Sequence, residues 1–229
     1  MIRQHLAASR GADSSRLEHF SDAVFAFAVT LLVVSLEVPK SFPELMAALR
    51  GFVAFGLCFA MLVLVWLFHC HFFRRYGLHD GAITLLNSVL LFFVLFYVYP
   101  LKFLFFSLFV GAGKINAHDI RTTFVVYGFG FAAVFMTFAL MYVHAWRKRD
   151  QLGLSEIERL RTRHILVNHL VVGTIGLSSV LLALVLPERH LYWAGYFYFV
   201  IAIYSVVIGL TERRRERRAI EATTRAAAN

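Results

Sequence analysis

Six apolar stretches, each bounded by charged residues, restrict what this chain can fold into. A helix rises about 1.5 Å per residue, so it needs about 20 residues to cross the roughly 30 Å hydrocarbon core of a bilayer. A soluble domain of 229 residues does not solvate 59% hydrophobic residues with 16% charged ones. The sequence therefore predicts an all-α membrane protein with six transmembrane helices per subunit: Phe20–Val38, Gly51–Phe73, Gly81–Leu101, Thr122–Trp146, His164–Pro187 and His190–Thr211.

Lysine and arginine positions predict the topology, because basic connections stay on the cytoplasmic side of a membrane. Most of the 23 basic residues lie in the amino-terminal arm, the second and fourth connections and the tail. We expect a multi-pass protein of the cell (inner) membrane with both termini cytoplasmic. Its parts are a cytoplasmic arm (1–18), a six-helix domain (19–211) and a basic cytoplasmic tail (212–229). The net charge of +9 then suits anionic lipid headgroups and indicates no nucleic-acid partner.

Local signals agree with this plan. All four prolines lie at or just beyond the outer end of a predicted span, where loss of a backbone donor is tolerated. In the fourth connection, Ser155 and Glu158 have the spacing of a capping box and predict a short cytoplasmic helix. The segment from Val126 to Gly130 lies in the middle of a span and is interpreted as helix packing, not as a carbonyl filter.

The central turns of all six predicted spans contain no Asp, Glu, Lys or Arg. Ion-coupled carriers usually need such a group near the midplane, so the pattern favours a passive pathway. Successive side chains of His69, Cys70 and His71 project about 100° apart on one helix and do not converge on one ion, so neither a metal nor a cofactor is predicted. The alternatives are a secondary transporter or proton-coupled carrier, and, as a third class, a membrane enzyme using the cytoplasmic histidines.

One stripe of the first span is a candidate pore lining. Phe27, Leu31 and Val34 fall within about 60° of one another on a helix, whereas Asp22 points about 140° away from Phe27. That stripe can line a narrow apolar seam while the carboxylate turns into the surrounding helices. On periodicity alone, an ordinary lipid-facing or core stripe is the alternative interpretation.

The polar entrance of this span carries a recognisable signature. Its Arg-x-x-x-Phe-Ser-Asp pattern, followed by a run of Ala, Val and Phe, resembles the first-helix signature of the transmembrane protein 175 family of potassium channels. A Trp-x-x-His element at the end of the second span also resembles that family, and the six-span layout covers essentially the whole chain. The residues that carry the resemblance, and the signature network it implies, are Arg16, Phe20, Ser21, Asp22, Trp66 and His69.

The resemblance implies a homotetramer whose first helices line one pore and conduct potassium passively, with no enzymatic activity. The hydrophobic constriction would fall at Phe27, Leu31 and Val34, although the family usually has Ile or Leu where this chain has Phe27. Either Phe27 or Leu31 would form the narrowest ring. We also expect Asp22 to be held by Arg16 and His69, and Leu32, on another face, to tolerate substitution with little effect on permeation. The partners are therefore potassium ions, the lipid bilayer and further copies of the chain.

Overall fold

A computed structural model describes residues 2–34, 40–106, 117–201 and 204 of the chain. Within these ranges the regular structure is helical. The long helices are α1 (Ile2–Val34), α2 (Phe42–Tyr76), α3 (Gly81–Phe106), α4 (Ala117–Arg147) and α5 (Glu156–Val185), followed by the short η2 (Glu188–His190) and α6 (Tyr192–Tyr196).

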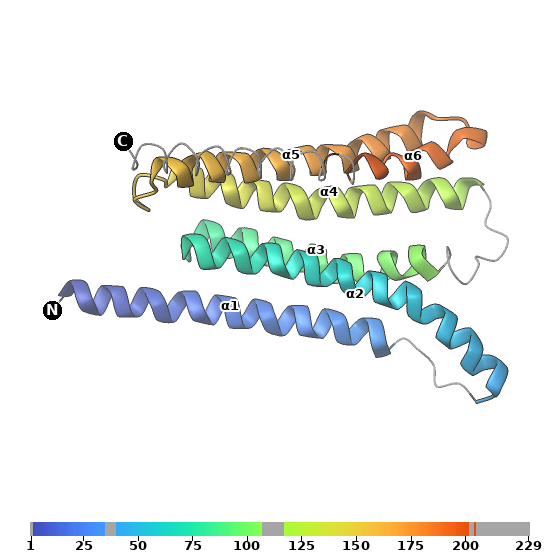
Figure 1. Ribbon diagram of the computed structural model, residues 1–229, viewed down its shortest axis with the longest axis horizontal. Helices are drawn as coiled ribbons and strands as arrows, with labels where there is room; N and C mark the ends of the chain where they lie inside the picture. Colours follow the sequence, from blue (N-terminus) through green and yellow to red (C-terminus); the bar gives the residue numbers. More distant parts are fainter. Residues whose placement is uncertain (1, 35–39, 107–116, 202–203, 205–229) are drawn as a thin grey trace, which may run out of the picture.

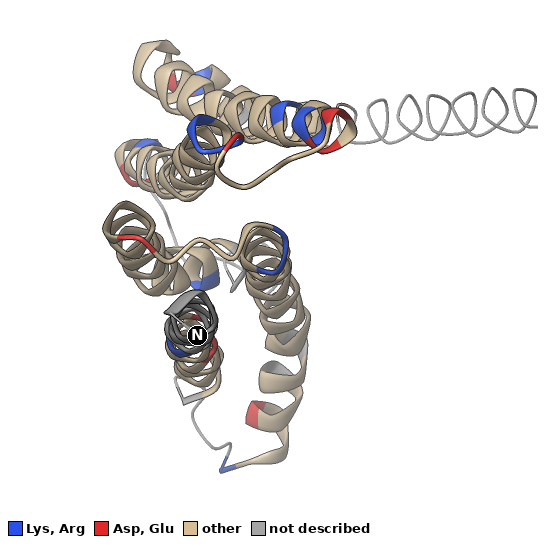
Figure 2. Ribbon diagram, turned by 90° about the vertical axis from the view of Figure 1, so that its left-hand side faces the viewer, with Lys and Arg blue, Asp and Glu red and all other residues tan. Residues whose placement is uncertain are grey.

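Consecutive long helices run antiparallel to one another along the long axis of the molecule (Figure 1). The start of α1, the α2–α3 connection and the α4–α5 connection therefore lie at the same end of the bundle. Figure 2 looks onto this end, which we call the basic end because it carries Arg74, Arg75, Arg147, Lys148 and Arg149. The connections that the sequence predicts to share one side of the membrane are thus on one side of the fold.

Within the described residues, four helices are long and apolar enough to cross a membrane: Phe42–Tyr76, Gly81–Leu104, His118–Arg147 and Glu156–Val185. They contain the second, third and fourth predicted spans and the fifth as far as Val185, two residues short of its predicted end at Pro187. The first predicted span is helical as far as Val34, and its last residues lie outside the described ranges. Of the sixth predicted span, the described part contains α6, and most of the remainder lies outside these ranges.

The helix ends follow local chemistry. Ser41 caps α2, Pro43 sits in its first turn, and Gly77 ends it in the left-handed conformation with φ of 55°. The capping box of Ser155 and Glu158 is confirmed, but it starts the long helix α5 and not a separate short one. Pro100 also differs from expectation, because it lies inside α3, which continues to Phe106.

Helix α3 connects the packing of the bundle, because it contacts α1, α2 and α4. Helix α1 packs on α2 and α3, while α4 packs most extensively on α5 and contacts α3. Glycines allow the close α4–α5 approach: a Cβ built on Gly128 would lie 2.5 Å from a Val180 methyl and 3.0 Å from the Gly176 carbonyl oxygen. This supports the interpretation of the Val126–Gly130 segment as helix packing. Helix α1 consequently lies at one edge of the bundle and α5 at the other (Figures 1 and 2).

Candidate functional site

Helix α1 has one buried and one uncovered face. Its buried side chains recur at intervals of four and three residues: Ser21, Phe25, Ala28 and Leu32. On the other side, the rings of Phe20 and Phe27 are 60% and 56% exposed, although each is large and apolar. The residues that line this uncovered face of α1 are Arg16, His19, Phe20, Ala23, Ala26, Phe27 and Thr30. Farther from the basic end, the side chains on this face are therefore almost all apolar or small.

The three predicted constriction residues do not share one environment. Phe27 lies on the uncovered face, whereas Leu31 is half-buried and packs partly against the core. Val34 ends α1, and its side chain lies outside the described part of the structure. Thr30, which the sequence interpretation did not single out, is exposed on the same face, with its hydroxyl donating to the Ala26 carbonyl at 2.9 Å.

Leu32 is a core residue, so its substitution should cost stability, while its small effect on permeation stays a prediction. Its side chain is only 1% exposed and belongs to the cluster that holds α1, α2 and α3 together. Truncating a buried leucine to alanine costs about 2–5 kcal/mol. Leu32 is on a different face from Phe27, as predicted, but that face is the packed one.

A buried chain of hydrogen bonds joins α1, α2 and α3 near the basic end. His69 Nε2 donates to the Asn87 amide oxygen at 2.9 Å, Asn87 Nδ2 donates to the Ser21 hydroxyl at 2.9 Å, and Ser21 donates to the Leu17 carbonyl at 2.8 Å. An amide oxygen only accepts, so Nε2 of His69 carries the proton. The three side chains are at most 1% exposed. They fix the rotation of α1 against its two neighbours.

Asp22 has a different partner from the two predicted. Its carboxylate accepts a hydrogen bond of 2.7 Å from the Trp66 indole nitrogen, while neither Arg16 nor His69 bonds it. Arg16 is six positions before Asp22, which turns their side chains about 120° apart around α1. His69 is occupied by Asn87. The signature residues thus form two linkages, Asp22–Trp66 and Ser21–Asn87–His69, and Phe20 belongs to the uncovered face.

The Asp22–Trp66 pair lies at an apolar groove of about 330 Å³ between α1 and α2. Besides that pair, its lining comprises Phe25, Ala26, Val29, Leu62 and Val63. A carboxylate that receives an indole N–H at such a site is fixed in position without a counter-charge. The pair therefore sets the separation of α1 from α2 beside the uncovered face.

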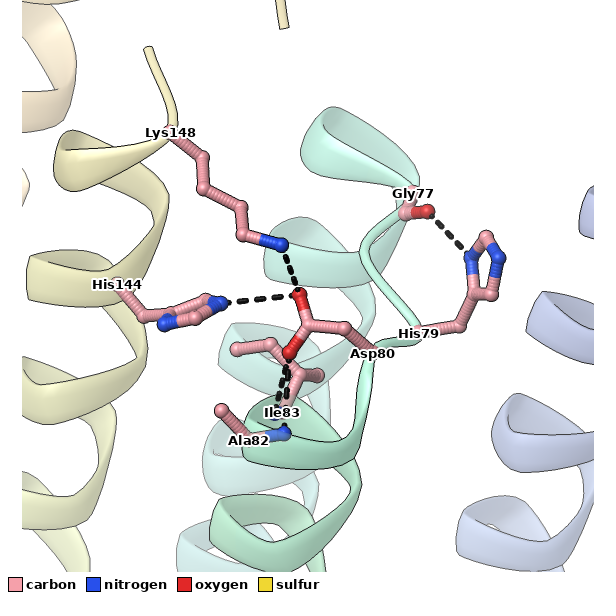
Figure 3. A network of polar contacts seen from close by, with 7 residues as sticks. All are labelled: Gly77, His79, Asp80, Ala82, Ile83, His144 and Lys148. Atoms are coloured by element: carbon pink, nitrogen blue, oxygen red, sulfur yellow. Dashed lines mark hydrogen bonds and ion pairs between the residues drawn. The ribbon is translucent and has the colours of Figure 1, made fainter. Parts of the chain in front are cut away.

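Asp80 forms a second polar cluster at the basic end (Figure 3). One carboxylate oxygen accepts from His144 Nε2 at 2.9 Å and from Lys148 Nζ at 2.8 Å, and the other accepts from the backbone N–H groups of Ala82 and Ile83, both at 3.1 Å. Burial alone would raise the pKa of Asp80, but these hydrogen bonds outweigh it and hold the pKa well below its usual range. Asp80 thus starts α3 and ties it to α4.

The long apolar helices define a multi-pass helical membrane protein, and the polar side chains described above lie near one end of these helices. The chain belongs to the TMEM175 family. Residues 16–97 match the family described as "Endosomal/lysosomal potassium channel TMEM175". The matched region begins at Arg16 and contains the whole Ser21–Asn87–His69 chain and the Asp22–Trp66 pair.

Relatives cover nearly all of the chain. It is 35% identical over 229 aligned residues to a protein of Marivirga tractuosa named "Potassium channel". This alignment covers 93% of each of the two chains. A crystal structure of a variant of the potassium channel MtTMEM175, in complex with a nanobody–MBP fusion protein, is similar with a TM-score of 0.76 and 34% identity over 87% of this chain and 93% of that one. A lysosomal potassium-selective channel TMEM175 homolog from Chamaesiphon minutus gives a TM-score of 0.61 and 25% identity over 86% and 97%.

Proposed function

We propose that this protein is a potassium channel that conducts K⁺ passively. The observation that carries the proposal is the uncovered apolar face of α1, which continues directly from the family signature at Arg16 to Asp22. Within a bilayer, large aromatic rings on such a face contact lipid, another copy of the chain or a narrow dewetted path. The relatives that are named potassium channels indicate that the conducted ion is potassium.

The pore assembles from several copies, because one chain presents one such helix face. Four α1 helices around a common axis in a homotetramer enclose a single path, with the arm (1–18) and tail (212–229) in the cytoplasm and six spans in the domain between them (19–211). The residues Arg16, Phe20, Ala23, Phe27, Thr30 and Val34 recur at alternating steps of four and three. This is the spacing of a left-handed helix bundle and supports such an assembly.

The constriction lies at Phe27, Leu31 and Val34, with Phe27 more exposed on the uncovered face than Leu31. Apolar rings expel water from a narrow path and favour the cation that sheds its hydration shell more readily, which is potassium in preference to sodium. Thr30 lies one turn beyond Phe27 and offers a hydroxyl oxygen within the apolar stretch. The two polar linkages hold α1 in register while ions pass.

Potassium flux from liposomes, measured without a coupled counter-ion, tests the proposal. Phe27→Ala should widen and wet the narrow ring, so potassium flux should rise several-fold while discrimination against sodium falls. The matched control is Phe129→Ala on α4, because Phe129 is likewise 56% exposed but lies away from α1. For Leu31→Ala, the corresponding control is the exposed Leu181 of α5.

Two results would contradict the proposal. If flux responds to Phe129 and not to Phe27, α1 does not line the path. If potassium moves only when a proton or sodium gradient is supplied, the protein is a coupled carrier and not a channel.

A further inference from the structure

A hydrogen bond between α2 and α5 marks a seam at the basic end. The Tyr76 hydroxyl lies 2.7 Å from the Thr162 hydroxyl, and Thr162 donates its own proton to the Glu158 carbonyl at 2.7 Å. Tyr76 is therefore the donor. Both side chains are buried. Two arginines flank this bond in the sequence. Arg75 directly precedes Tyr76 on α2, and Arg163 directly follows Thr162 on α5.

Among the residues that the structure describes, Arg75 has no anionic partner at this seam. Its guanidinium carbon lies 5.8 Å from the centre of the Tyr76 ring, and its buried Nε has no acceptor within the described residues. Glu158 is within electrostatic reach, but its carboxylate accepts from the backbone and hydroxyl of Ser155, at 2.9 and 2.8 Å. A half-buried guanidinium without a counter-charge, whose Nε lacks an acceptor, favours an anion with several oxygens.

Arg163 lies on the outward face of α5 among apolar side chains. Its neighbours on that face, Leu160 and Val167, are 69% and 46% exposed. The face continues at alternating steps of four and three residues to Leu184, which is about 32 Å from Arg163 at 1.5 Å per residue. This distance matches the roughly 30 Å hydrocarbon core of a bilayer. Arg163 consequently sits at the level of the headgroup phosphates.

We propose that Arg75 and Arg163 bind the headgroup of an anionic phospholipid at the α2–α5 seam. Guanidinium groups bind phosphate oxygens through paired hydrogen bonds, and the apolar stripe from Val167 along α5 offers a track for the acyl chains. That stripe favours a lipid over a free phosphate ion. Since α5 and α1 lie at opposite edges of the bundle, lipid reaches the seam even when α1 faces other copies of the chain (Figures 1 and 2). The site does not depend on which ion is conducted.

Native mass spectrometry of the full-length protein in detergent, titrated with phosphatidylglycerol, tests the site. Each guanidinium near a membrane surface contributes about fivefold to anionic lipid affinity. We therefore expect Arg75→Gln and Arg163→Gln each to weaken binding about fivefold, and the double variant about 25-fold. Arg189→Gln is the matched control, because Arg189 is exposed at the opposite end of the bundle and its loss removes the same charge.

Other outcomes overturn the assignment. An equal loss of affinity in Arg189→Gln means general charge attraction. Equal binding of phosphatidylcholine means that the headgroup is not selected. Competition by about 10 mM inorganic phosphate, roughly tenfold above a 1 mM Kd, means a site for soluble anions. If Arg75→Gln fails to fold, Arg75→Lys keeps the charge but loses the paired hydrogen bonds, so binding should weaken, by less than fivefold, and unchanged affinity would count against the site. Arg163 is exposed, so its substitution leaves the core intact, and unchanged affinity in Arg163→Gln alone also refutes the proposal.

Discussion

Asn87 should be the polar side chain whose loss most weakens the attachment of α1. It is fully buried, and it is the only link between the His69 imidazole and the Ser21 hydroxyl within the described residues. Asn87→Leu replaces the amide with a side chain of similar volume, so the effect reports hydrogen bonding more than a cavity. Ser21 keeps its bond to the Leu17 carbonyl, whereas the His69 Nε2–H loses its acceptor.

The expected cost follows from this inventory. Two hydrogen bonds, each worth about 0.5–1.5 kcal/mol net, are lost, and the stranded buried N–H costs about 1–3 kcal/mol. Leucine burial returns part of this, so we expect about 3 kcal/mol of destabilisation. For a chain of this size that lowers the melting temperature by about 6–12 °C.

A double-mutant cycle separates the stranded donor from other effects. His69→Phe removes the donor itself and suits a site where the ring lies 5.6 Å from Phe25 and 4.6 Å from Phe73. Thermal unfolding of the purified protein in detergent should then show that the double variant, Asn87→Leu with His69→Phe, loses less stability than the two single changes added together. Strict additivity would refute the reasoning, because the two side chains would not be coupled.

Three further outcomes are expected in the same unfolding assay. Gly128→Ala should destabilise the protein by about 1–3 kcal/mol, because its new methyl clashes with α5, whereas Gly56→Ala, with nothing within 4 Å, should be neutral or stabilising. Arg121→Gln should cost about 1–3 kcal/mol, because its guanidinium donates two 3.0 Å hydrogen bonds to the last carbonyls of α5. Asp80→Asn should lower stability at pH 7. Because the folded pKa of Asp80 lies below the ordinary 3.8, its contribution is present above about pH 4 and lost as the pH falls through the folded pKa, so the difference from wild type should shrink below about pH 4.

The spans and helix starts were predictable because their signals are local. A charged residue at each end of an apolar run is enough to place a membrane helix: α2 to α4 contain the runs predicted for them, and α5 contains its run as far as Val185. The Ser155 cap needs only a residue three positions away. Pro100 was misjudged because a proline near a helix end removes little, and the tertiary contacts of α3 carry the helix past it.

The partner of Asp22 was not predictable in this way. Arg16 and His69 were chosen as complementary charges, yet the structure uses the Trp66 indole, one turn before His69 on the same helix. Which of two neighbouring turns faces a carboxylate depends on the rotation of α2 against α1, and that rotation is decided by packing across the whole interface. The sequence did hold one usable signal, since Asn87 is the one amide in the long apolar run of α3 and such groups are buried only with partners.

The same rotation decides which side chains of α1 face away from the bundle. At about 100° per residue, Thr30 lies about 170°, Phe27 about 130° and Leu31 about 90° from the middle of the buried stripe formed by Ser21, Phe25, Ala28 and Leu32. A stripe of hydrophobic residues alone selects Phe27 and Leu31 together, because nothing in it distinguishes the centre of a face from its edge. The buried stripe makes that distinction. It sets Phe27 and Thr30 toward the proposed path and leaves Leu31 at its margin, so the flux change in Phe27→Ala should exceed that in Leu31→Ala.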